Sequence, residues 1–301
     1  MLNQDEEEIP LAYSIDNAIL MHRDAHFGGN FDLMLDYYKK NGRGISQEFD
    51  VARIEQLYRA QRQGGKDLAP LLLSGAEAEK IARVRMAYKR LRSLYEVKNQ
   101  KNRLPLLIAD LILAEEEDLP AAIDAVVAEK GTIVPSLIEL LRSEDFYDPL
   151  FPGYGEAPTY AAQCLGKIGD QRAIISLFEA IGDADFYSEG MLLEALHAIG
   201  TPAKTFLLRV LHSQPINADN EKAAVALIAF KGDPEVVEAC INMLETIDLK
   251  NNELFATYLV LACEAISSPE QRKRLLELAQ RKDFPKNLQK DIQLIAQNWS
   301  L

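Results

Sequence analysis

Three segments of this chain repeat one pattern at a fixed spacing, and this repeat constrains the fold more than any other feature. In each copy a leucine recurs 31 residues after the previous one: Leu165, Leu196 and Leu227. The apolar residue three positions later keeps the same spacing. A period of 20–50 residues is typical of stacked structural repeats, which present a long surface rather than one catalytic pocket.

The repeat unit is expected to be two antiparallel helices. The first, over 157–168, ends at a glycine, and the second, over 171–181, packs back along it. Glycine ends helices readily, and the Asp, Thr or Ser that follows it is a preferred residue just before the next helix. One such pair cannot bury its own apolar face, so neighbouring pairs stack into a continuous core. The sequence therefore predicts an all-α array.

The motif Ala-x-x-Leu-Gly-x-Ile-Gly-Asp-x-x-Ala, from Ala162 to Ala173, and its two copies resemble the HEAT-repeat family. The resemblance is to the short HEAT-like repeats of the phycobilisome-lyase subtype, and it covers about residues 119–283. It implies a right-handed α-α superhelix, that is, a HEAT-like solenoid. Most such proteins are scaffolds and a few are enzymes. Similarity of fold alone assigns no function, bilin-lyase activity included.

The first hundred residues show helical periodicity without the repeat. Helices are expected over 13–26, 31–40, 47–63 and 76–98. We therefore expect a helical N-terminal region over 1–103 and the HEAT-like solenoid over 104–301, closed by a final helix at 286–299.

Charge is spread unevenly along the chain, whose net charge is -13. Residues 80–103 hold nine basic residues and one acidic residue, whereas residues 104–301 hold 16 basic and 31 acidic residues. An acidic array favours a partner with a basic segment.

The longest apolar stretch, Leu104 to Ala114, is far shorter than the roughly 20 residues that cross a bilayer, and the acidic N-terminus lacks the pattern of a signal peptide. A cytoplasmic protein without a membrane partner is expected.

Signatures of common enzymes and cofactors are absent from the sequence. There is no glycine-rich phosphate loop and no Gly-x-Ser-x-Gly elbow. The three cysteines, Cys164, Cys240 and Cys263, form no Cys-x-x-Cys pair and lie among apolar residues, so we expect buried thiols rather than disulfides or a zinc site. No cofactor is expected.

The densest polar cluster is His22-Arg23-Asp24-Ala25-His26. On a helix His22 and His26 share one face at metal-ligand spacing, so a metal-dependent enzyme that uses His22, Asp24 and His26 is one hypothesis. The alternative, which we favour, is a helix C-terminus, where histidines interact well with the helix dipole and Gly28-Gly29 ends the helix.

A basic helix is the second candidate. An apolar stripe at helical spacing runs from Ile81 to Tyr95, and five cations occupy its other faces: Arg83, Arg85, Lys89, Arg90 and Arg92. They predict either a surface for nucleic acid or an acidic partner, or else a solvated face or neutralisation of the acidic solenoid beside the helix. Nothing supplies a second basic element for a nucleic-acid footprint, so the solvated face or neutralisation is favoured and nucleic acid is not the expected partner.

Aromatic residues in two loops between repeats are the third candidate. Residues 143–156 interrupt the array, and an Asp-Phe-Tyr motif in this insertion recurs at 185–187. Insertions in repeat proteins are often on the binding face. The candidate anchors are Tyr147, Phe151, Tyr154 and Tyr187, with packing between repeats as the alternative. The leading hypothesis is a non-enzymatic scaffold that binds a protein partner through its concave face and these loops.

Overall fold

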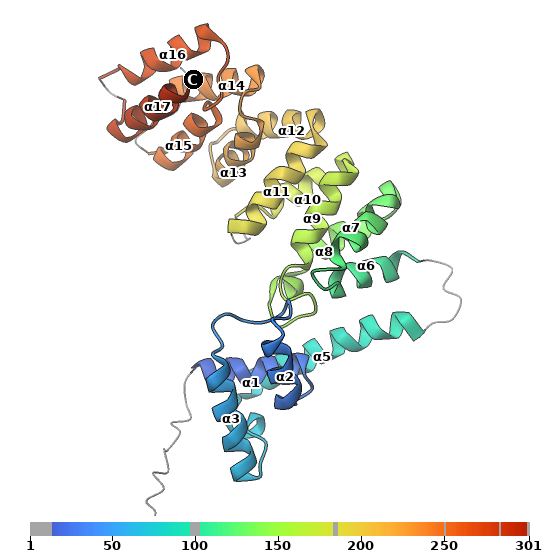
Figure 1. Cartoon of the computed structure of the whole chain (residues 1–301). Coiled ribbons are helices and arrows are strands. Elements are labelled where there is room, and N and C mark those ends of the chain that lie inside the picture. The colour runs from blue at the N-terminus through green and yellow to red at the C-terminus, as the bar shows by residue number, and fades with distance from the viewer. Residues whose placement is uncertain (1–13, 97–102, 183–185, 250, 283, 300–301) are drawn as a thin grey trace, which may run out of the picture. The chain divides into compact units, whose positions relative to one another are not determined.

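A computed structural model describes the chain over residues 14–96, 103–182, 186–249, 251–282 and 284–299. Within these ranges all regular structure is helical and no strand occurs, which confirms the all-α prediction. Backbone contacts divide the chain, shown in Figure 1, into two compact units. Unit 1 comprises Met1–Ala128 and Ser143–Pro158, and unit 2 comprises Glu129–Arg142 and Thr159–Leu301.

The units divide the chain at positions other than residue 103, where the composition changes. Helices α6 (Leu104–Leu113) and α7 (Leu119–Ala128) group with the N-terminal helices. The reason is packing, because α6 contacts α5 (Gly75–Glu96) and α7 contacts α6. The insertion over 143–156 belongs to the same unit, whose second segment is Ser143–Pro158.

The N-terminal helices of unit 1 match the expected ones closely. They are α1 (Ser14–His26), α2 (Phe31–Lys39), α3 (Val51–Gly64) and α5, with a short α4 (Ala69–Leu72) that the periodicity did not predict. Asn30 and Asp50 accept hydrogen bonds from the first backbone amides of α2 and α3, which fixes where these helices begin. The core between α1, α2 and α3 is apolar and includes Leu20, Met34 and Ile54, all fully buried.

Unit 2 is a succession of helices. They are α8 (Val134–Leu141), α9 (Ala157–Ile168), α10 (Ile174–Glu179), α11 (Phe186–Ile199), α12 (Thr201–Leu211), α13 (Ala218–Leu227), α14 (Pro234–Thr246), α15 (Glu253–Ala262), α16 (Pro269–Ala279) and α17 (Lys286–Asn298). Short 3-10 turns also lie between the described helices: η1 (Lys130–Thr132), η3 (Gln171–Ala173) and η4 (Ile228–Phe230) in unit 2, and η2 (Glu144–Tyr147) in unit 1.

Helices α12 to α17 of unit 2 form two rows (Figure 1). One row joins α12 to α14 and α14 to α16, and the other joins α13 to α15 and α15 to α17. Consecutive helices cross from one row to the other, as α14 does to α15 and α16 to α17. This arrangement leaves one side of each row facing away from the other row.

Small residues and caps explain why the repeated motif packs in this way. A Cβ atom on Gly166 would lie 2.7 Å from the Cα atom of Ala195, so glycine permits the close approach of α9 to α11. Gly169 has a φ of 70°, which ends α9, and Asp170 then accepts a hydrogen bond from the amide of Arg172. Asp233 caps α14 and Ser268 caps α16 in the same manner.

The three cysteines are buried free thiols in unit 2, as expected. In the part of the chain that the structure describes, no helix is long and apolar enough to cross a membrane.

Candidate functional site

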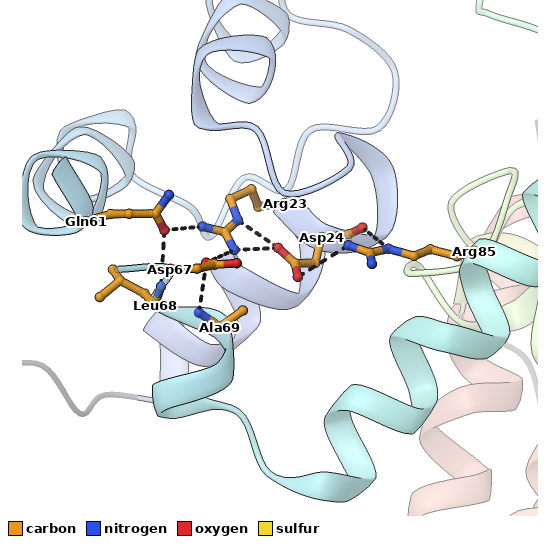
Figure 2. Close-up of polar contacts among 7 residues, drawn as sticks. All are labelled: Arg23, Asp24, Gln61, Asp67, Leu68, Ala69 and Arg85. Atoms are coloured by element: carbon orange, nitrogen blue, oxygen red, sulfur yellow. Dashed lines mark hydrogen bonds and ion pairs between the residues drawn. The ribbon is translucent and has the colours of Figure 1, made fainter. Parts of the chain in front are cut away.

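The C-terminal half of α1 carries a fully buried arginine at the centre of a polar network (Figure 2). Arg23 donates through Nε and Nη2 to Asp24 Oδ1 at 2.8 and 2.6 Å, and through Nη1 to Gln61 Oε1 at 2.6 Å. Nη2 also donates to Asp67 Oδ1 at 2.8 Å. Two carboxylates and an amide therefore compensate the buried guanidinium, which ties α1 to the end of α3 and the start of α4.

Asp24 links this network to the basic helix α5. Arg85 donates through Nε to the Asp24 carbonyl at 2.9 Å, and its Nη2 lies 3.4 Å from Asp24 Oδ2 (Figure 2). The carboxylate thus faces two arginines rather than the two histidines of the same helix. Asp24, one of the three residues in the metal hypothesis, is therefore paired with cations.

His22 and His26 do pack together, with ring centroids 4.5 Å apart. His22 is only 6% exposed, and its ring meets Phe27, Tyr38 and Phe49. His26 Nδ1 lies 2.7 Å from the Tyr88 hydroxyl of α5. The Nε2 atoms of both rings are buried and meet no hydrogen-bond partner among the described residues.

Burial keeps both imidazoles neutral. It lowers the pKa of His22 to about 3, with a further decrease from the nearby His26. It lowers the pKa of His26 to about 4, although the Pro149 carbonyl and the Asp148 charge favour protonation. Neutral imidazoles are competent metal ligands. The described residues nevertheless contain no group of three or more His, Cys, Asp or Glu side chains placed to hold a metal ion, so the pair lacks the further protein ligand that zinc sites use.

Tyr154 of the insertion packs against the histidine pair. Its ring lies 4.9 Å from that of His26, and its hydroxyl lies 3.4 Å from that of Tyr37. A Cβ atom on Gly44 would overlap the Tyr154 ring, so only glycine fits there. Tyr154 itself has a φ of 57°, a conformation that costs energy for a non-glycine residue and that the surrounding packing maintains.

Arg43 fixes the same insertion from another side. Its largely buried side chain pairs with Glu156 and donates to the carbonyls of Ala114 and Gly153. Its guanidinium also lies 5.9 Å from the centre of the Tyr154 ring, a cation-π contact. The insertion is therefore a part of unit 1 that packs on α1, the 40–50 loop and α5.

The charges of α5 are partly neutralised by this insertion. Lys80 pairs with Asp148, and Arg83 pairs with Asp145 at 3.2 Å. Arg85 is engaged by Asp24, which leaves Lys89, Arg90 and Arg92 exposed. Three cations of the basic helix thus have acidic partners, and all three partners belong to unit 1 rather than to the repeats.

Two of these three cations lie beside a cavity of about 380 Å³ between the end of α1 and α5. Lys89 and Arg92 line it together with Arg85, His26 and Tyr88, and Asp24 and Glu96 add negative charge. The mixed charge of the lining gives the cavity no clear preference for an anion.

The aromatic candidates have different environments. Phe151 is 2% exposed and packs with Ala25 and Val84, so it stabilises unit 1 rather than facing a partner. Tyr147 and Tyr154 are half-buried. Tyr187 lies in the first turn of α11, and its side chain is outside the described part.

The sequence reasoning missed a set of exposed leucines on the C-terminal helices of unit 2. Leu254 and Leu261 of α15 are 55% and 37% exposed, and Leu294 of α17 is 60% exposed. The sequence shows that α15 is apolar on almost all sides, but which side stays exposed follows only from its neighbours α13, α14, α17 and η4.

The sequence matches no protein-family model, and no curated protein is significantly similar to it.

Proposed function

We propose that unit 2 is a HEAT-like α-solenoid scaffold that binds a partner protein through the exposed side of the row that contains α13, α15 and α17. The two-row packing of its helices supports an extended binding surface, since each helix pair adds another helix to the same side. The partner would present an apolar surface of its own.

The observation that carries this proposal is the pair Leu254 and Leu261. These residues are seven apart on α15, so they share one face, and the half-buried Tyr258 lies between them. The other faces of α15 are filled by buried residues such as Phe255 and Leu259. Large apolar side chains that are aligned and exposed are typical of protein-interaction surfaces.

Helix α17 extends this surface. It runs beside α15 in the same direction, because Asn287 at its start bonds Glu253 at the start of α15, and Trp299 after its end donates to the Glu264 carbonyl at 2.8 Å. Leu294 is two turns after Asn287, on the same side of α17. Full burial of a leucine contributes about 1.5–3 kcal/mol, so covering the exposed parts of these three leucines would contribute roughly 3 kcal/mol to binding.

The other two hypotheses have less support from the geometry. Three cations of the basic helix have acidic partners within unit 1, which reduces the positive surface that nucleic acid would contact. The histidine pair is enclosed by aromatic rings, and its neighbour Asp24 faces arginines.

The test compares the proteins recovered from a native lysate by three forms of the chain. Wild type is compared with Leu254→Ser/Leu261→Ser, and the matched control is Leu33→Ser/Leu71→Ser, which changes two leucines of unit 1 that are 57% and 62% exposed. We expect wild type and control to recover the same proteins and the α15 variant to lose them. Equal recovery by all three forms would rule out this surface.

A further inference from the structure

Unit 1 contains a groove of about 470 Å³ that is separate from the surface proposed above. It lies where α6 packs between the end of α5 and α7. Its walls are mainly apolar or small, from Leu107 and Leu113 of α6 and from Ala121, Ala122 and Ala125 of α7. Its volume is within the range of sites that bind ligands or side chains of a partner.

The rim of the groove is acidic. Asp110 and Asp118 line it, and Asp110 accepts a hydrogen bond of 2.6 Å from the Tyr95 hydroxyl. Glu115, Glu116 and Glu117, directly before Asp118, are all exposed.

No basic residue lies within the segment that carries this negative charge, although Lys98, Lys101 and Arg103 directly precede it. Residues 104–128 contain six acidic residues and no lysine or arginine. In the part of the chain that the structure describes, no ion pair involves Glu115, Glu116, Glu117 or Asp118. Asp145 and Asp148 of the insertion, by contrast, form ion pairs with cations of α5.

The acidic character expected for the whole C-terminal array is in fact concentrated around this groove and the insertion. Residues 104–158 hold 12 acidic and 2 basic residues, whereas residues 159–301 hold 19 acidic and 14 basic residues. A basic partner would therefore be attracted mainly to this segment rather than to the repeats.

We infer that the α6–α7 groove binds a basic amphipathic helix of a partner protein. The alanines of α7 allow another helix to approach closely, and its apolar side chains would lie between Leu107 and Leu113. Its lysines and arginines would face Asp110, Asp118 and the three glutamates, which gives the complementary charge that such a groove needs. This site is in unit 1 and does not depend on the leucines of α15.

The experiment uses the full chain and a fluorescent synthetic peptide of about 18 residues made of leucine and lysine, with leucines on one helical face. Two control peptides have the same residues in shuffled order, or glutamate in place of lysine. Binding is followed by fluorescence anisotropy at low and at physiological salt. We expect the amphipathic basic peptide alone to bind, with weaker binding at higher salt because the rim charges are exposed.

Substitutions then test whether the peptide binds at this groove. Glu115→Gln/Glu116→Gln/Glu117→Gln should weaken binding at least about tenfold, or 1.4 kcal/mol, and Ala122→Trp should abolish it by filling the groove. The control Glu139→Gln/Glu194→Gln/Glu270→Gln removes the same charge at exposed positions of unit 2 and should change the affinity less than about twofold. Circular dichroism confirms that each variant is folded.

Equal weakening by both triple variants, or equal binding of the shuffled peptide, would overturn the inference, because either result indicates only general attraction by negative charge. Self-association of the chain that Ala122→Trp abolishes would assign the groove to a second copy instead of a partner. If the lysate experiment rules out the α15 surface, the expected binding of the peptide to the groove does not change. The two proposals therefore fail independently.

Discussion

The guanidinium group of Arg23 donates to the carboxylate of Asp67 over 2.8 Å, although 44 residues separate them in the sequence. Arg23 is fully buried, whereas about half of the Asp67 side chain is exposed. The interaction joins the end of α1 to the residues before α4, and Asp67 in turn accepts a bond from the amide of Ala69. Folding of the short α4 is thereby coupled to a charge inside unit 1.

We expect Arg23→Met to destabilise unit 1 by about 3–5 kcal/mol, because it leaves the Asp24 carboxylate in a largely buried place with less compensation. Asp67→Asn should cost less than about 1 kcal/mol, since Asp67 is half exposed and solvent screens its charge. Arg59→Met, at an exposed position of α3, is the control and should change stability by less than about 0.5 kcal/mol.

Urea denaturation measures these effects, with far-UV circular dichroism reporting both units. Fluorescence of Trp299, the single tryptophan, reports unit 2, and the urea midpoint that it measures should not change. A cost below about 1 kcal/mol for Arg23→Met would mean that the network of Figure 2 contributes little to stability.

Stability should fall as the pH decreases from neutral toward 4. Burial lowers the pKa of His22 to about 3 and that of His26 to about 4, compared with the usual 6.5. Between these values and 6.5 the unfolded chain binds more protons than the folded chain, so protonation favours unfolding. Each histidine should make the free energy of unfolding about 2 kcal/mol lower at pH 5 than at pH 7.5.

His22→Phe tests the origin of this pH dependence, because phenylalanine suits the surrounding rings and does not titrate. The difference in unfolding free energy between pH 7.5 and 5 should decrease by about 2 kcal/mol in this variant. Equal pH dependence in wild type and His22→Phe would contradict the assignment.

Gly44→Ala should loosen the insertion from unit 1. The added Cβ atom would overlap the Tyr154 ring, and overpacking of this kind costs about 1–3 kcal/mol. Hydrogen exchange of residues 148–156 is the direct measurement and should become faster. Gly64→Ala is the matched control, since a Cβ atom there meets nothing within 4 Å.

A double-mutant cycle locates the clash. If Tyr154 is its cause, Gly44→Ala should cost far less in a Tyr154→Ala background than in wild type, where the two rings of His26 and Tyr37 hold Tyr154 in place. If the losses of stability in the two single variants add up to the loss in the double variant, Gly44→Ala acts within the 40–50 loop and not through Tyr154.

Asp233→Ala should destabilise unit 2 by about 1–2 kcal/mol. Asp233 accepts hydrogen bonds from the amides of Glu235 and Val236 at the start of α14 and pairs with Lys204 of α12 at 2.9 Å. Asp233→Asn keeps the cap and removes the charge, so it should cost less than Asp233→Ala. Urea denaturation followed by Trp299 fluorescence checks both, and equal costs would mean that the ion pair, not the cap, is what matters.

Local patterns were sufficient to predict most helices. The predicted first helix of the repeat, 157–168, has the bounds of α9, because Gly169 and Asp170 supply a strong stop and cap. The final helix α17 also begins where expected, at Lys286. The four residues of α4 escaped prediction, since so short a helix has no periodicity and its Leu68 offers no side-chain cap.

Long-range contacts could not be predicted from spacing. The repeat suggested that residues 143–156 form a loop of the array, whereas the structure packs them on α1 and α5 through Phe151 and Tyr154. The spacing predicted that His22 and His26 lie together, as they do, whereas the pairing of Asp24 with Arg23 and Arg85 depends on side-chain directions that spacing does not give. The exposed face of α15 required the neighbours of that helix to be known.

The most direct test of the scaffold proposal places a photo-activated cross-linking residue at Leu254, identifies the partner that it captures, and then measures the affinity of that purified partner by calorimetry. We predict that Leu254→Ser/Leu261→Ser raises Kd at least about tenfold, whereas Leu33→Ser/Leu71→Ser leaves it unchanged. An unchanged Kd in the α15 variant would contradict the account.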